Sequence, residues 1–109
     1  MPRRSEAPLE ALEELASIDD LLEHRVRLAI CVLLSRHDAF SFTRLKELLR
    51  ETDGSLGTHL RKLEDAGYLA VERTYQERRP VSWYRLSAKG RRQLGRHLES
   101  LTLLIERGR

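Results

Sequence analysis

Apolar residues recur at helical spacing through the first third of the chain. The first predicted helix covers residues 8–17, and apolar residues stand at every third position in and just after it: Leu9, Leu12, Leu15 and Ile18. A second helical stretch follows to about residue 36, with a wide apolar stripe. His24 and Arg25 can break this stretch in two, and the sequence leaves that question open.

Two shorter helices are predicted next, with a short polar turn between them. Ser41 is suited to cap a helix over residues 42–50, and either Thr52 or Asp53 can cap a helix over residues 54–66. The buried face of the second helix is expected to consist of leucines at spacings of four and three: Leu56, Leu60 and Leu63.

The period of the pattern changes to two after Gly67, which is expected to end the preceding helix because glycine accepts the left-handed conformation. Residues 68–75 and 81–86 are predicted to form two strands of a hairpin, with a polar turn over residues 76–80. In the second strand, Tyr84 and Leu86 are expected in the core and Trp83 against a terminal helix. A last helix is predicted over residues 88–107, with apolar positions at Leu94, Leu98, Leu101, Leu104 and Ile105.

Length and composition indicate one domain that is mainly α-helical with a small β-hairpin, an α+β fold. The chain has 109 residues, of which 40% are hydrophobic and 34% charged, so it can bury one modest core. We expect residues 1–8 to form a flexible lead and residues 9–109 the domain. No apolar run approaches the ~20 residues of a membrane span, and the N-terminus does not resemble a signal peptide. These features predict a cytoplasmic protein with no membrane partner.

Two segments then carry a resemblance to a known group. They are His59-Leu-Arg-Lys-Leu-Glu-Asp-Ala-Gly-Tyr68 and, after the hairpin, Tyr84-Arg-Leu-Ser-Ala-Lys-Gly90. Together with the order of the elements, they resemble the small winged helix-turn-helix transcriptional regulators close to the MarR and ArsR families, over about residues 20–100. The resemblance implies a helix-turn-helix over residues 42–66, a wing over 68–86 and a homodimer. It also implies that helix 54–66 enters the major groove of double-stranded DNA, with the wing beside the backbone or minor groove.

The residue types on the outer side of helix 54–66 suit DNA. Small, polar and cationic residues stand opposite the leucines: Gly54, Ser55, Thr58, Arg61 and Lys62. Arg61 can read guanine with its two-pronged donor set, and Lys62 suits a phosphate. The alternative is a solvated helix face whose charges pair within the helix. His59 adjoins the leucine stripe, and the sequence does not decide whether it is packed or contacts DNA.

The wing tip, residues 75–80, carries two adjacent arginines, Arg78 and Arg79, which suit a minor groove or phosphates. The alternative is a merely soluble loop. Residues 50–92 hold ten Lys or Arg against six Asp or Glu, a net charge of +4, so the rest of the chain carries −1 of the total +3. The positive excess therefore coincides with the proposed readout elements.

A subunit interface is expected where the chain has more apolar helical positions than one small core needs. The candidates come from both ends of the chain: Leu9, Leu12, Leu15, Leu94, Leu98, Leu101, Leu104 and Ile105. A symmetric dimer would place two copies of helix 54–66 roughly 34 Å apart, one turn of DNA.

No catalytic, metal or cofactor site is predicted. The single cysteine, Cys31, lies in an apolar run and is expected to be a buried, inert thiol, and the four histidines show no metal-ligand spacing. Phosphate-cradling and nucleophile motifs are absent from the sequence, so we do not expect an enzyme. A small-molecule effector is possible, but its chemistry is not indicated. The competing hypothesis is a winged-helix module that binds proteins and not DNA.

Overall fold

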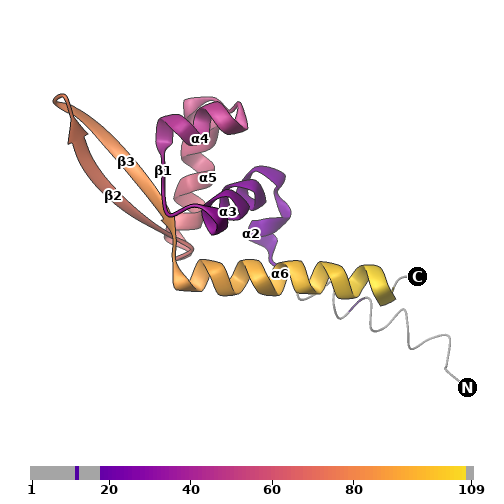
Figure 1. Cartoon of the computed structure of the whole chain (residues 1–109). Helices are drawn as coiled ribbons and strands as arrows, with labels where there is room; N and C mark the ends of the chain where they lie inside the picture. Colours follow the sequence, from indigo (N-terminus) through magenta and orange to yellow (C-terminus); the bar gives the residue numbers. More distant parts are fainter. Residues whose placement is uncertain (1–11, 13–17, 108–109) are drawn as a thin grey trace, which may run out of the picture.

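The computed structural model describes residue 12 and residues 18–107, and it confirms a mostly helical fold with a small antiparallel sheet (Figure 1). The elements in chain order are α2 (Asp20–Glu23), α3 (Arg25–Arg36), β1 (Phe40–Ser41), α4 (Phe42–Leu49), α5 (Asp53–Asp65), β2 (Leu69–Gln76), β3 (Arg79–Leu86) and α6 (Ala88–Arg107). The helix predicted over residues 8–17 lies outside the described residues, apart from Leu12. None of the helices in the described part of the chain is long and apolar enough to cross a membrane.

Side-chain caps set the helix boundaries. His24 ends α2 in an extended conformation, and its Nδ1 accepts a hydrogen bond from the backbone N–H of Val26, so the predicted stretch is indeed broken at this residue. Ser41 caps α4 as predicted, and Thr52, not Asp53, caps α5 by accepting from the N–H of Ser55 at 3.1 Å. Gly67 follows α5 with a φ of +81°, which explains the glycine there.

The sheet has three strands in the order β1-β3-β2, of which β1 was not predicted from the sequence. Two residues are too short for a periodic signal, and β1 exists because Phe40 pairs with Tyr84 of a strand far away in sequence. The hairpin turn is also tighter than predicted: Gln76 pairs with Arg79, and only two residues connect the strands. Both turn residues have positive φ, 52° and 67°, as a two-residue turn of a twisted hairpin requires.

The predicted turn over residues 76–80 is therefore corrected, because Pro80 belongs to β3 and lies opposite Tyr75. Proline lacks the backbone N–H that a residue of a central strand donates to a neighbouring strand. Since β1 pairs with β3 only at Trp83 and Tyr84, β3 has a single neighbour at Pro80, and proline is tolerated there.

The core lies between α3, α4, α5, the base of the hairpin and the first half of α6. The three leucines predicted for the inner face of α5 are buried, as are Tyr84 and Leu86. Trp83 differs from its prediction, because its indole N–H donates to Thr74 Oγ1 of β2 at 3.1 Å, which holds the ring over the hairpin. Cys31 is buried, and burial raises the pKa of its thiol to about 12, which keeps it protonated and unreactive.

Candidate nucleic-acid interface

The outer face of α5 forms a shallow hollow of about 410 Å³. Its lining consists of Asp53, Gly54, Gly57, Thr58, Arg61, Lys62 and Asp65. The structure thus brings together four of the five residues predicted for this helix. Ser55 lies apart from them, because its hydroxyl donates to Glu51 Oε2 at 2.7 Å.

The two glycines of α5 are not required by packing inside the protein. A Cβ atom added to Gly54 or Gly57 would meet nothing within 4 Å. Glycine inside a helix costs roughly 0.5–1 kcal/mol relative to alanine. Their presence therefore leaves the backbone of α5 open to close approach from outside the molecule.

Local hydrogen bonds and ion pairs order the residues around this hollow. Thr58 Oγ1 donates to the carbonyl of Gly54 at 2.9 Å, which fixes the Thr58 rotamer and leaves its oxygen available as an acceptor. Lys46 of α4 pairs with Asp53 at 2.8 Å and so offsets one of the two carboxylates that line the hollow. Arg61 and Lys62 remain exposed on the same face.

His59 does not line this hollow and is half-buried. Its ring lies 4.3 Å from that of His24, and its Nδ1 lies 3.2 Å from Arg27 Nη1. Burial, followed by the charges of His24 and Arg27, lowers the pKa of His59. His59 is therefore a packed residue that holds α5 against α2 and α3.

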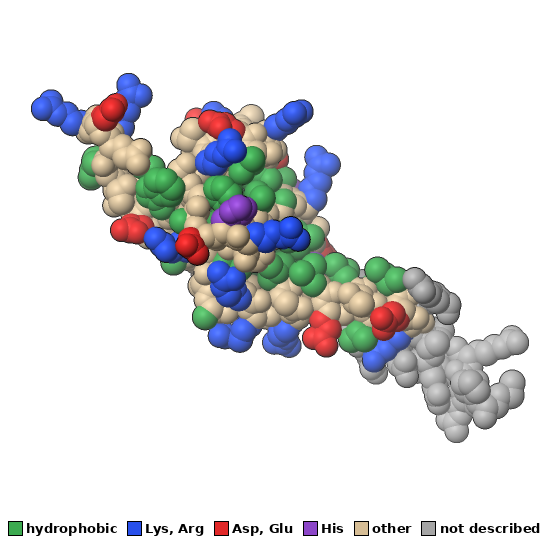
Figure 2. Space-filling view, in the orientation of Figure 1, with side chains coloured by type: hydrophobic (Ala, Val, Ile, Leu, Met, Phe, Trp, Pro, Cys, Tyr) green, Lys and Arg blue, Asp and Glu red, His purple; other side chains and the backbone are tan. Residues whose placement is uncertain are grey.

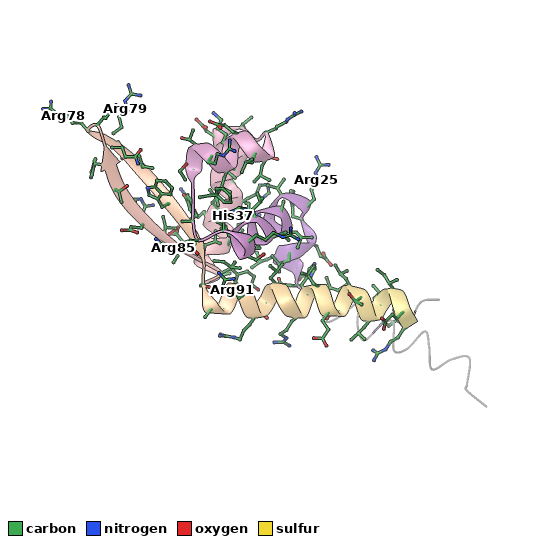
Figure 3. All side chains as sticks on the ribbon, in the orientation of Figure 1. Arg25, His37, Arg78, Arg79, Arg85 and Arg91 are labelled. Carbon is green, nitrogen blue, oxygen red and sulfur yellow. The ribbon has the colours of Figure 1, made fainter. Side chains whose placement is uncertain are left out.

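Arg78 and Arg79 lie at the exposed tip of the hairpin, where the chain projects furthest from α6 (Figure 3). The space-filling view shows basic side chains gathered at this tip beside an acidic one (Figure 2). Glu77 and Arg78 form the two-residue turn. The hairpin thus presents its paired arginines on an arm that extends from the core.

A second hollow, of about 320 Å³, separates α5 from the inner face of the hairpin. Its lining comes from four elements: Gly57, Leu60, Arg61 and Glu64 of α5, Arg73 of β2, Ser82 and Tyr84 of β3, and Phe42 of α4. Arg73 was counted in the charge balance of the sequence but was not chosen as a site residue. The alternation of side chains along a strand could have indicated this position, because Arg73 shares a strand face with Val71 and Leu69.

Comparison with known proteins decides the family. The sequence profile of the winged helix DNA-binding domain matches residues 26–105. The chain belongs to this family. An uncharacterised protein of Methanocaldococcus jannaschii, MJ0432, is 36% identical over 66 residues, which cover 61% of this chain and 72% of that protein.

Solved structures agree with this assignment. A transcriptional regulator homologue from Pyrococcus horikoshii OT3 is 28% identical with a TM-score of 0.79, over 89% of this chain and 95% of that chain. The ArsR family transcriptional regulator RHA00566 shares the fold, with a TM-score of 0.54 at 21% identity over 97% of both chains. The resemblance to MarR- and ArsR-like regulators is confirmed. The family is that of a winged helix DNA-binding domain, and these relatives are transcriptional regulators, which are in general not enzymes.

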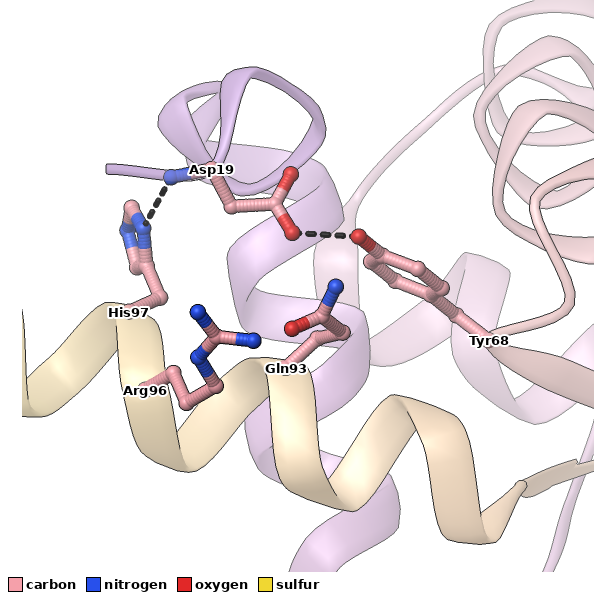
Figure 4. A pocket seen from close by; sticks show the side chains of 5 residues that line it. All are labelled: Asp19, Tyr68, Gln93, Arg96 and His97. Atoms are coloured by element: carbon pink, nitrogen blue, oxygen red, sulfur yellow. Dashed lines mark hydrogen bonds between the residues drawn. The ribbon is translucent and has the colours of Figure 1, made fainter. Parts of the chain in front are cut away.

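A polar hollow of about 270 Å³ lies at the junction between the winged helix and α6, lined by Asp19, Tyr68, Gln93, Arg96 and His97 (Figure 4). The Tyr68 hydroxyl donates to Asp19 Oδ2, and the backbone N–H of Asp19 donates to His97 Nδ1 at 3.2 Å. Burial and the bond to Asp19 raise the pKa of Tyr68 to about 12. This network was not predicted from the sequence, because the bonded residues are 49 and 78 positions apart.

The apolar stripe of α6 divides into two parts. Leu94 is only 5% exposed and belongs to the core, which corrects its assignment to a subunit interface because little of its surface is left for a second chain. Leu98 is 42% exposed and Ile105 61%, while Leu101 and Leu104 are half-buried. Leu12 is exposed, and Leu9 and Leu15 lie outside the described residues.

Proposed function

We propose that this winged helix binds specific sites on double-stranded DNA as a homodimer and thereby regulates transcription. The outer face of α5 carries the proposal, because it combines an open glycine backbone with Thr58, Arg61 and Lys62 on one exposed surface. In this proposal α5 enters the major groove, and residues 75–80 of the wing lie on the backbone or in the minor groove.

Each side chain on α5 has a chemistry that fits its proposed contact. Arg61 would read guanine with two donors, and Lys62 would meet a phosphate as a point charge. Thr58 would offer its hydroxyl oxygen as an acceptor and its methyl group to a thymine methyl. Ser55 would contribute only an acceptor, because its proton is bonded to Glu51. Gly54 and Gly57 would let the helix axis approach the base edges.

The proposed dimer uses the second half of α6. Its exposed and half-buried apolar residues include the predicted Leu98, Leu101, Leu104 and Ile105 together with Leu103, and Leu12 is a further candidate. A two-fold axis at this surface would present two copies of α5 to one face of the duplex, with half-sites about one turn apart.

The test is the salt dependence of binding to a fluorescent duplex. Phosphate contacts make the affinity fall steeply between about 50 and 200 mM salt, with a slope of about −0.9 for each phosphate neutralised. Replacing Arg78 and Arg79 together by glutamine is expected to weaken binding and reduce this slope. The matched control replaces Arg91 and Arg92, two exposed arginines of α6, and is expected to leave the slope unchanged. Salt-independent or undetectable binding of the unchanged protein would contradict DNA binding.

Recognition of a specific DNA sequence is tested by selecting bound duplexes from a pool of random sequences. Arg61→Ala is expected to relax the preference at one base position by about 1–3 kcal/mol. If the selected sequences stay the same, Arg61 does not read a base. If the protein shows no preference and instead binds a protein partner through α5, the alternative of a protein-binding winged-helix module is favoured.

A further inference from the structure

The hollow between α5 and the wing, hereafter the trough, has cationic side chains on opposite sides. Arg61 stands on the α5 side, and Arg73 stands on the wing side opposite its cross-strand partner Ser82. A smaller hollow of about 210 Å³ shares Phe42 and Ser82 with the trough and is also lined by Thr43 of α4 and Pro80 of β3. Ser82 therefore lines both hollows, the trough with its two arginines and the adjoining hollow with the Thr43 hydroxyl.

We propose that the trough seats the sugar-phosphate backbone of one DNA strand and that Arg73 is a phosphate ligand. The inference rests on the proposed function, and it adds a contact that neither the helix face nor the wing tip provides. Adjacent major and minor grooves are separated by one backbone strand. A protein that places a helix in one groove and a wing in the next must therefore straddle that strand, and the trough lies between these two elements.

The floor and walls of the trough fit a phosphodiester. Two guanidinium groups line the trough and supply charge-assisted donors, which bind phosphate oxygens strongly. The hydroxyl of Ser82, which also bonds to Tyr84, lines the trough, and that of Thr43 lines the adjoining smaller hollow. Gly57 leaves the α5 wall of the trough without a side chain, because a Cβ there would project into open space. Tyr84 at the base is buried, so the trough ends on a packed core and not on a mobile loop.

Glu64 is the opposing charge in the trough. It lines the α5 side, and its carboxylate raises the pKa of Tyr84 in addition to the effect of burial, whereas Arg73 lowers it. The two charges thus act on one hydroxyl from opposite walls. A phosphate near Arg73 would be repelled by Glu64, so this carboxylate is expected to limit affinity.

Arg85, on the opposite face of the wing, is the control for Arg73. Arg85 of β3 pairs with Ala70 in the strand register, so its side chain is on the face away from Arg73. Its guanidinium lies 4.0 Å from Glu72, and it is exposed. Figure 3 shows Arg85 near the base of the hairpin, far from Arg78 and Arg79. Removing the charge of Arg85 changes the net charge by the same amount as removing that of Arg73.

The experiment compares Arg73→Gln, Arg85→Gln and Glu64→Gln by fluorescence anisotropy with a duplex of mixed sequence over a salt series. Arg73→Gln is expected to weaken binding severalfold for every sequence and to reduce the salt slope by about 1. Arg85→Gln is expected to match the unchanged protein. Glu64→Gln is expected to bind more tightly, because a repulsive charge has been removed.

The outcomes separate the two proposals. If Arg73→Gln keeps the full slope while the double variant of Arg78 and Arg79 loses part of it, the trough does not hold a phosphate but the winged helix still binds DNA. If Arg85→Gln and Arg73→Gln reduce the slope equally, the effect is general charge, and the trough is again excluded. If the unchanged protein does not bind duplex DNA, both proposals are wrong.

Discussion

His59 lies on α5, the helix proposed to contact DNA, but its own contacts are within the fold. Its neighbours are His24, which caps α3, and Arg27, whose Nε donates to the carbonyl of Leu21 at 2.7 Å. Because these groups lie on α2 and α3, His59 connects α5 to the first two described helices. Protonation of His59 would place a positive charge beside Arg27 and against a partly buried surface.

The stability of the protein is therefore expected to depend on pH through His59. Its pKa is lowered in the folded protein, so the unfolded chain takes up a proton first as the pH falls below about 6.5. The contribution is present above that pH and is lost as the pH falls toward the folded pKa. Urea unfolding of the unchanged protein and of His59→Gln over a pH series measures this. Parallel curves for the two proteins would contradict the prediction.

At the scale of elements, α5 combines two features that oppose each other. Its leucines anchor it in the core, and its glycines lower its intrinsic helix stability without any packing reason within the chain. A position that is unfavourable for the fold and unexplained by packing is a candidate for a binding role. We therefore expect α5 to be less stable than the same helix with alanine in place of its two glycines. The glycines leave its outer surface open.

Gly57→Ala is expected to raise the free energy of unfolding by about 0.5–1 kcal/mol, since alanine favours the helix and its Cβ meets nothing. The same change is expected to weaken DNA binding, because the methyl group would occupy the surface that approaches DNA. Thermal unfolding and duplex titration measure the two effects separately. Gly95→Ala in α6, where an added Cβ also meets nothing, should stabilise the protein and leave binding unchanged. Unaltered DNA affinity in Gly57→Ala would remove the reason proposed for the glycine.

At the scale of the whole molecule, α6 has a first half that packs against the core and a second half that carries an apolar surface. Its first half is packed closely: a Cβ at Gly90 would lie 2.3 Å from the carbonyl oxygen of Tyr68, so only glycine fits there. His97, 2% exposed, extends this packing through its bond to Asp19. The second half retains exposed leucine and isoleucine side chains. A contact made by this half would fix the relative position of two winged helices.

Ile105→Glu is expected to yield a folded monomer, because a side chain that is 61% exposed contributes little to the core of one chain. Sedimentation velocity and circular dichroism measure assembly and folding independently. DNA affinity should also fall, since two linked copies bind one duplex more tightly than one. Glu99→Ala, an exposed polar position of the same helix, serves as the control and should leave assembly intact. An unchanged dimer in Ile105→Glu would place the subunit interface elsewhere.

Much of the fold and part of the site could be predicted from the sequence. The caps at Ser41 and Thr52, the stop at Gly67 and the leucine spacing were sufficient to locate α5, the helix proposed to contact DNA, and its outer face. These features depend on hydrogen bonds and side-chain directions within a few residues, which a periodic pattern encodes directly. The tip arginines were likewise apparent, because a turn between two strands is exposed.

Only the tertiary structure decided which of the apolar and polar positions are exposed and which are packed against other elements. Leu94 and Leu98 belong to the same sequence stripe, yet one is buried and the other exposed. His59 was placed by His24 and Arg27, and the trough by the approach of the wing to α5. Each of these results depends on contacts between residues distant in the chain. Local periodicity determines the side of a helix on which a residue lies, whereas packing determines what, if anything, covers that side.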